Sequence, residues 1–209
     1  MALLILISGV ASAQQLCRNA NGVDVLCTNL GAAVSTACRQ AVDAADLSRL
    51  TNLTTYAGCK DDTACTMKRV GLQVAAEKRL PADLVLAMLW TESRWNQWDD
   101  LGDVIVGGGV DFGAGQLNIT THRRNYDWSQ VEGDILYNTR ASGDVLQWSY
   151  NYSRRQSGRS GEDLLRATYG VYNAGPRGAT RPFVRNDPRD ANFLRHLRAK
   201  PWRALVGGC

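Results

Sequence analysis

Apolar side chains recur at helical spacing between residues 80 and 98, and the rest of the chain is organised around this stretch. The repeating positions are Leu84, Val85, Met88 and Leu89. Side chains three and four residues apart share one face of a helix, so these positions form a single apolar stripe. Pro81 suits the first turn of the helix, because the N–H that proline lacks has no intrahelical partner there. We therefore predict a helix that begins near Pro81.

Glu92 continues this apolar stripe, and Trp95 follows it. A carboxylate on an apolar face loses hydration, which disfavours its charged form and raises its pKa. A raised pKa is what a general acid needs in order to hold a proton near neutral pH. The alternative is a structural glutamate that is satisfied by an arginine or by backbone N–H groups, which is the more common situation for an isolated glutamate in a helix. Other motifs must decide between the two.

Helical periodicity recurs along most of the chain. We predict further helices over 32–50, from a cap within 61–63 to about 78, from 129 or 131 to 138, from 139 to about 155, and over 162–172. Gly175 and Pro176 end the last of these, as a glycine just past a helix followed by proline commonly does. Residues 99–118 hold too much glycine for a helix, so they form a loop or small hairpin that presents Gln116, with a possible strand at 104–106. The predicted fold class is mainly α, of the α+β kind.

Residues 1–13 are apolar, carry no charged side chain and end in Ala11-Ser12-Ala13, the small-residue pattern of a signal peptidase site. We expect a signal peptide at 1–13 and a periplasmic or secreted protein. The positively charged start of such a signal is missing, so an apolar N-terminal helix is the alternative. No other run approaches the ~18 apolar residues of a membrane span, so we expect no stable membrane insertion.

Residues 14–66 form a cysteine-rich region that holds all but one of the 6 cysteines. An even number of cysteines in an exported chain favours disulfides. Asn21-Gly22 has the sequence preference of a two-residue hairpin turn, which would bring the cysteines on its two arms together. The short interval between Cys59 and Cys65 suggests a second local bridge, and Cys38 and Cys209 then remain to form the third. The predicted pairs are Cys17–Cys27, Cys59–Cys65 and Cys38–Cys209, although six cysteines allow many other pairings.

Charge and metal-binding patterns narrow the function classes. The net charge is +4, and arginine and lysine crowd residues 177–203, which form either a solvated face or a contact for an anionic polymer. No nucleic-acid-binding motif is present, and export argues against such a partner. The cysteines lack Cys-x-x-Cys spacing and nearby histidines, and the glycines of 107–115 form no phosphate-binding motif. We therefore expect neither a metal nor a cofactor.

Four stretches resemble, in the same order, the motifs of one enzyme family. They are Glu92–Trp95, Gly113–Leu117, Asn138–Gly143 and Val171–Pro176. They are similar to the patterns Glu-Ser-Arg/Ser-Phe, Gly-Leu-Met-Gln-Leu, Asn-Ile-x-Ala-Gly and Ala-Tyr-Asn-Ala-Gly-Pro of the soluble-lytic-transglycosylase (SLT) domain. These bacterial enzymes have a lysozyme-like fold and cleave the glycan strand of peptidoglycan. The resemblance covers about 67–195, and it departs from the family at Ala114-Gly115, which replaces Leu-Met, and at Val171, which replaces Ala.

The resemblance implies a lysozyme-like catalytic domain at 67–209 and a role for each matching position. Glu92 would be the sole general acid and base, Gln116 and Tyr172 would hydrogen-bond to the substrate, and Ser93 and Asn173 would orient their neighbours. The reaction that it implies breaks the MurNAc-GlcNAc β-1,4 bond and closes a 1,6-anhydro ring on MurNAc, so that no water is consumed. The implied partner is the glycan strand, and we expect a monomer.

Two alternatives remain open at the level of the sequence. A hydrolase that resembles goose-type lysozyme would use a second carboxylate to activate water, and the acidic loop offers candidates for it. These candidates are Asp99, Asp100, Asp103 and Asp111. The other alternative is a catalytically silent glycan-binding envelope factor, which only the altered Ala114-Gly115 favours. Taken alone, Tyr172 and Asn173 also fit the end of a helix with a capping asparagine.

Overall fold

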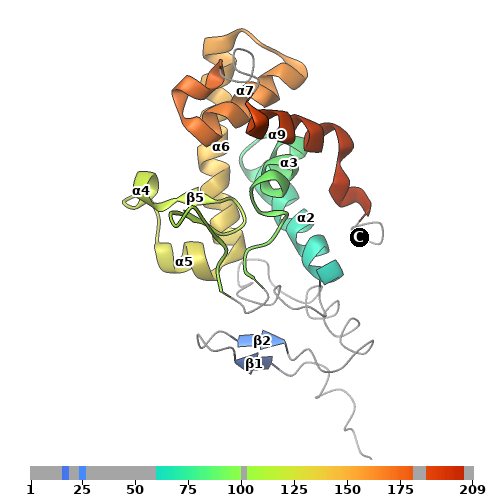
Figure 1. Cartoon of the computed structure of the whole chain (residues 1–209), viewed down its shortest axis with the longest axis vertical. Helices are drawn as coiled ribbons and strands as arrows, with labels where there is room; N and C mark the ends of the chain where they lie inside the picture. The colour runs from blue at the N-terminus through green and yellow to red at the C-terminus, as the bar shows by residue number, and fades with distance from the viewer. Residues whose placement is uncertain (1–15, 19–23, 27–59, 100–102, 181–186, 205–209) are drawn as a thin grey trace, which may run out of the picture.

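The protein is mainly helical and carries a small antiparallel sheet (Figure 1). The computed structural model describes residues 16–18, 24–26, 60–99, 103–180 and 187–204, with backbone only up to residue 66. The predicted fold class, mainly α with a minor β part, is confirmed at this level. The helix predicted over 32–50 and the signal peptide at 1–13 lie outside the described residues.

The bounds of the elements are as follows. The helices are α2 (Lys60–Glu77), α3 (Ala82–Ser93), α4 (Ile119–His122), α5 (Trp128–Gly133), α6 (Ile135–Ser157), α7 (Gly161–Ala174) and α9 (Pro188–Ala199), with 3-10 turns η4 (Pro176–Ala179) and η5 (Pro201–Ala204). Strands β3 (Val106–Gly107), β4 (Asp111–Phe112) and β5 (Leu117–Asn118) form a sheet in that order, and β1 (Leu16–Arg18) pairs with β2 (Asp24–Leu26).

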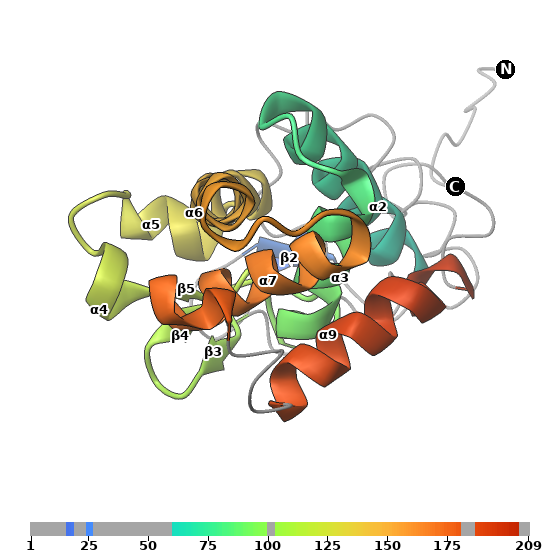
Figure 2. The same ribbon diagram turned by 90° about the horizontal axis from the view of Figure 1, so that it is seen from above.

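Helix α3 lies between α2 and α9 and forms the centre of the core (Figure 2). Its start was predicted correctly, because Pro81 is the residue just before the first turn. Every residue from Leu84 to Leu89 is buried. The middle of α3 is therefore enclosed on all sides, whereas the apolar stripe predicted burial of one face. Burial of each large aliphatic side chain is worth about 1.5–3 kcal/mol relative to exposure, so this run is a major source of stability.

The break between α5 and α6 falls at Asp134, so the prediction that a helix ends at Asn138 and the next begins at Thr139 is wrong. The Asp134 carboxylate accepts hydrogen bonds from the N–H groups of Leu136 at 2.8 Å and Tyr137 at 3.0 Å. It thereby caps the first turn of α6. Asn138 and Thr139 lie inside α6 and are buried.

Two further helix boundaries differ from the sequence prediction. Helix α2 begins at Lys60, so residues 61–63 lie in its first turn and do not precede it. Helix α9 was not predicted, because its residues were assigned only to the general basic segment of 177–203. Its signals are Asp187, which accepts a hydrogen bond from the Arg189 N–H at 2.9 Å, and Pro188 in the first turn.

Strands β1 and β2 form the predicted hairpin, but not with a two-residue turn at Asn21-Gly22. Leu16 pairs with Leu26 and Arg18 pairs with Asp24, so the register is centred on one residue and the connection has an odd number of residues. Four cysteines fall outside the described residues, and the three proposed disulfides stay predictions. They are Cys27, Cys38, Cys59 and Cys209.

Among the described helices, none combines the length and the apolar character that crossing a membrane requires.

Turn η4 packs directly on the backbone of α7, and Gly178 makes this contact possible. A Cβ atom at Gly178 would lie 1.7 Å from the carbonyl oxygen of Gly170. We expect Gly178→Ala to lower the free energy of unfolding by about 1–3 kcal/mol or more, because backbone atoms cannot move aside as a side chain does. The control is Gly133→Ala, since nothing lies within 4 Å of a Cβ at that position. Urea denaturation of both variants tests this, and equal midpoints would contradict the close packing.

Candidate active site

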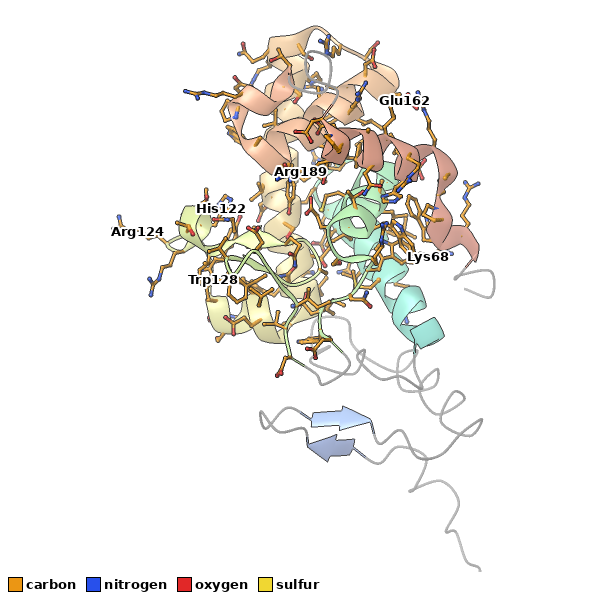
Figure 3. The ribbon with its side chains drawn as sticks, in the orientation of Figure 1. Lys68, His122, Arg124, Trp128, Glu162 and Arg189 are labelled. Atoms are coloured by element: carbon orange, nitrogen blue, oxygen red, sulfur yellow. The ribbon has the colours of Figure 1, made fainter. Side chains whose placement is uncertain are left out.

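A cleft of about 590 Å³ is formed where α3, the small sheet, α4, α6, α7 and α9 meet. Glu92, Gln116, Tyr172 and Asn173 all line it. Arg189 from α9 and His122 from α4 also line it, and Figure 3 shows both side chains. The cleft therefore collects residues from three of the four stretches that resemble the transglycosylase motifs.

Glu92 lies in the last turn of α3, whose end is fixed by two residues with left-handed backbone. Arg94 has φ 58° and Trp95 has φ 65°, conformations that are uncommon for residues other than glycine. The Arg94 N–H donates to the Trp90 carbonyl at 3.0 Å, and the Trp95 indole N–H donates to the Leu86 carbonyl at 3.0 Å. The chain therefore turns away immediately after Glu92 and leaves its carboxyl at the cleft.

Helix α9 supports the same turn from the other side. The Arg94 guanidinium lies 2.8 Å from Nε2 of His196 and stands over the ring of Trp90 at 5.8 Å from its centroid. Burial and the charge of Arg94 lower the pKa of His196 to about 4. His196 is therefore neutral at physiological pH, and Arg94 can donate a hydrogen bond to it without charge repulsion.

The Glu92 carboxyl is partly buried, and its Oε1 atom has no hydrogen-bond partner among the described residues. Loss of hydration raises the pKa of Glu92 to about 7, and the negative charge of Asp111 adds to the rise. A hydrogen bond from the Tyr169 hydroxyl and the positive charge of Arg189 lower this pKa and offset part of the rise. The pKa of Glu92 thus lies close to neutral pH, which suits a group that both gives and takes protons.

Gln116 sits in a loop that two buried amides hold in place. The Gln97 side chain accepts a hydrogen bond from the Ala114 N–H at 2.8 Å, and the Asn138 side chain accepts one from the Gly115 N–H at 3.1 Å. Gln116 itself has φ 50°, and its side-chain amide donates to the Gly113 carbonyl at 2.9 Å. The amide oxygen of Gln116 packs against Gly107, where a Cβ atom would lie 2.1 Å from it.

Tyr172 connects α7 to this loop. Its hydroxyl donates to the Gly115 carbonyl at 2.6 Å. Burial and the neighbouring Glu92 raise the pKa of Tyr172 well above its ordinary value, so the phenol keeps its proton as a donor. Tyr172 therefore both lines the cleft and positions the loop of Gln116. Its loss would leave a carbonyl unpaired, which costs about 1–3 kcal/mol when the group is buried.

The other two predicted residues differ in their positions. Asn173 lines the cleft, and its side-chain oxygen accepts a hydrogen bond from Arg189 at 3.2 Å. It does not cap α7, because the cap is Gly175, whose N–H donates to Val171 at 2.7 Å. Ser93 is buried at the end of α3, where its hydroxyl donates to the Leu89 carbonyl at 3.2 Å. Ser93 therefore supports the turn after Glu92 and does not line the cleft.

Sequence reasoning missed two residues that act on Glu92. Tyr169 is buried and stacks flat on Phe193, with ring centroids 4.3 Å apart. Its position three residues before Tyr172 on the same helix face was the available signal. Arg189 was included only in the general basic segment, because its place at the cleft depends on how α9 packs.

Of the four acidic candidates, Asp111 lines the cleft. It accepts a hydrogen bond from the Asn118 amide at 2.7 Å. Asp99 and Asp103 instead bond to each other: the Asp103 N–H donates to the Asp99 carboxylate at 3.0 Å, and the Asp99 N–H donates to the Asp103 carbonyl at 2.8 Å. Asp100 lies outside the described residues.

Within the described ranges, no group of three or more His, Cys, Asp and Glu side chains is arranged to hold a metal ion. Comparison of the chain with protein-family models gives no match, and comparison with curated proteins gives none.

The raised pKa of Glu92 makes stability depend on pH in a defined direction. Because the folded state holds the proton more tightly than the unfolded chain, the stability that protonation contributes is complete below about pH 4.5 and is lost as the pH rises through about 7. We expect Glu92→Gln to gain stability relative to wild type by up to about 3 kcal/mol between pH 4.5 and pH 8. Chemical denaturation across this range measures it.

The control with the opposite sign is Glu77→Gln. The hydrogen bond from Arg140 lowers the pKa of Glu77 to about 2. The ionised Glu77 therefore stabilises the folded state above about pH 4.5, and this stabilisation is lost as the pH falls toward 2. The variant should be less stable than wild type at pH 7 and equally stable at pH 2. A stability difference for Glu92→Gln that stays flat from pH 4.5 to pH 8 would show that the carboxyl is hydrated like a surface group.

Proposed function

We propose that the chain is a peptidoglycan lytic transglycosylase with a lysozyme-like fold. The observation that carries the proposal is the Glu92 carboxyl, which has a pKa of about 7 and lies in a cleft that Gln116 and Tyr172 also line. These residues come from separate stretches that resemble motifs of one family. The small antiparallel sheet packed among helices is compatible with the proposed fold.

The proposed reaction uses the two protonation states of Glu92 in turn. The neutral carboxyl gives its proton to the glycosidic oxygen between MurNAc and GlcNAc, and the bond from that oxygen to C1 of MurNAc breaks. The carboxylate then takes the proton of the C6 hydroxyl, whose oxygen bonds to C1 and closes the anhydro ring. Tyr169 and Arg189 stabilise the carboxylate between the two steps. Because its pKa is about 7, Glu92 can both donate and accept a proton near neutral pH.

The proposal includes the surroundings in which the enzyme works. We propose that the chain is exported through a cleaved signal peptide, acts as a monomer on glycan strands and carries disulfides in its cysteine-rich N-terminal region. Exported proteins of this kind meet peptidoglycan, and oxidising compartments allow disulfides.

The direct test is lysis of purified cell walls by Glu92→Gln. The amide has the same volume but cannot transfer a proton, so we expect a rate loss of more than about 10²–10⁴, the range for one general acid or base, because one group serves both steps. Turbidity gives the rate, and mass spectra of the released fragments should show anhydro products that are one water lighter than hydrolysis products.

Glu162→Gln is the matched control. Glu162 is an exposed residue of α7 that forms an ion pair with Arg198 at 2.5 Å and does not line the cleft. We expect this variant to lyse walls as wild type does. A folded Glu92→Gln protein that lyses walls at the wild-type rate would refute the assignment of Glu92.

A second candidate function, hydrolysis, is favoured by one observation. Asp111 lies in the cleft and its charge acts on Glu92. A second carboxylate across a cleft is the arrangement by which inverting glycosidases activate water. Hydrolysis would leave products without the anhydro ring.

Asp111→Asn separates the two functions. The asparagine oxygen can still accept the bond from Asn118, so the sheet should stay intact. If Glu92 acts alone, we expect the anhydro product to persist, and the alkaline limb of the pH profile to move to lower pH because the negative charge that raises the Glu92 pKa is gone. If wild type instead releases hydrolytic products and Asp111→Asn releases none, Asp111 is the base that activates water.

A further inference from the structure

A second, smaller pocket of about 200 Å³ adjoins the cleft. His122, Val145 and Trp148 line both hollows, so the wall between them comes from α4 and α6. Asn125 and Asp144 contribute polar groups to the smaller pocket. None of these residues takes part in the proton transfers of the proposed reaction.

Trp148 is the unusual member of this wall. It is 48% exposed, although tryptophan is among the most costly side chains to leave in water. Its ring stacks on that of Tyr152, one turn further along α6, with centroids 5.4 Å apart and planes inclined by 23°. Single exposed hydrophobic residues are ordinary. An aromatic face that is already oriented, at the junction of two hollows, is instead suited to contact a ligand.

The polar groups around Trp148 indicate the kind of ligand. Asn125 is exposed and offers an amide, and Asp144 is paired with Lys78, so its carboxylate presents acceptor oxygens with a compensated charge. A flat apolar face with a rim of amide and carboxylate groups matches a pyranose ring. The C–H groups of one sugar face pack on the aromatic ring, and the equatorial hydroxyl and acetamido groups reach the rim.

We propose that Trp148, oriented by Tyr152, forms a subsite that binds an N-acetylhexosamine ring of the glycan strand outside the position that is cleaved. The identity of the polymer rests on the proposed function. The pocket shares His122, Val145 and Trp148 with the cleft, so a strand held in the cleft passes next to Trp148. A polymer that occupies both hollows is held more firmly than one that occupies the cleft alone.

The test measures binding and not cleavage. In the Glu92→Gln background, isothermal titration with the β-1,4-linked hexasaccharide of N-acetylglucosamine gives a Kd. We expect Trp148→Ala to raise this Kd about tenfold, as loss of a buried aromatic contact commonly does. Trp148→Phe keeps a ring and should recover most of the affinity. Leu72→Ala removes another exposed apolar side chain, 40% exposed on α2, and should leave the Kd unchanged.

The outcomes separate this subsite from the proposed function. A tenfold loss with Trp148→Ala that Trp148→Phe restores supports the subsite, even if wild-type protein fails to lyse walls. An unchanged Kd in Trp148→Ala, or no measurable binding of the hexasaccharide by Glu92→Gln protein, overturns it, even if wild-type protein lyses walls. Thermal unfolding checks that each variant is folded, and Trp148→Gln replaces Trp148→Ala if the latter is not.

Discussion

The position of Glu92 depends on the way in which α3 ends. Burial of residues 84–89 fixes the helix in the core, and the left-handed turn at Arg94 and Trp95 stops it one residue past Glu92. Each part of this turn is held by contacts from elsewhere, the Trp95 indole by the Leu86 carbonyl and Arg94 by His196. Backbone in a sparsely populated conformation persists only when its surroundings fix it. The carboxyl is therefore held at the cleft by a rigid turn and not by a hydrogen bond to Oε1.

The opposite wall of the cleft depends on buried amides. Gln97 and Asn138 are buried, and both accept bonds from the loop before Gln116 while donating to the Val131 carbonyl, at 2.9 and 3.1 Å. Buried polar groups need their full set of partners, so this network allows few other loop conformations. Because Gln97 lies four residues after Ser93, the end of α3 and the loop of Gln116 are tied to each other. The two walls of the cleft are thus one connected structure.

The sequence predicted what local patterns determine. The start of α3, the partly buried position of Glu92, the glycine-rich turns and the end of α7 before Gly175 all follow from spacing and from the properties of proline and glycine. The break at Asp134 was missed because a capping carboxylate competes with a helical pattern that continues through it. Arg189 could not be assigned, because its effect on the Glu92 pKa comes from the packing of α9, and the helical spacing of Tyr169 from Tyr172 indicates a shared face but not contact with Glu92.

The departure at Ala114-Gly115 has a physical explanation in the packing of α6. A Cβ atom at Gly115 would lie 2.0 Å from the Ser142 hydroxyl oxygen and 3.3 Å from the Tyr172 hydroxyl. Glycine at position 115 therefore leaves room for the Ser142 side chain of α6. In this packing the Gly115 carbonyl accepts a hydrogen bond from Tyr172, and the Gly115 N–H donates one to Asn138. The altered residues are therefore compatible with the hydrogen bonds that hold this loop at the cleft.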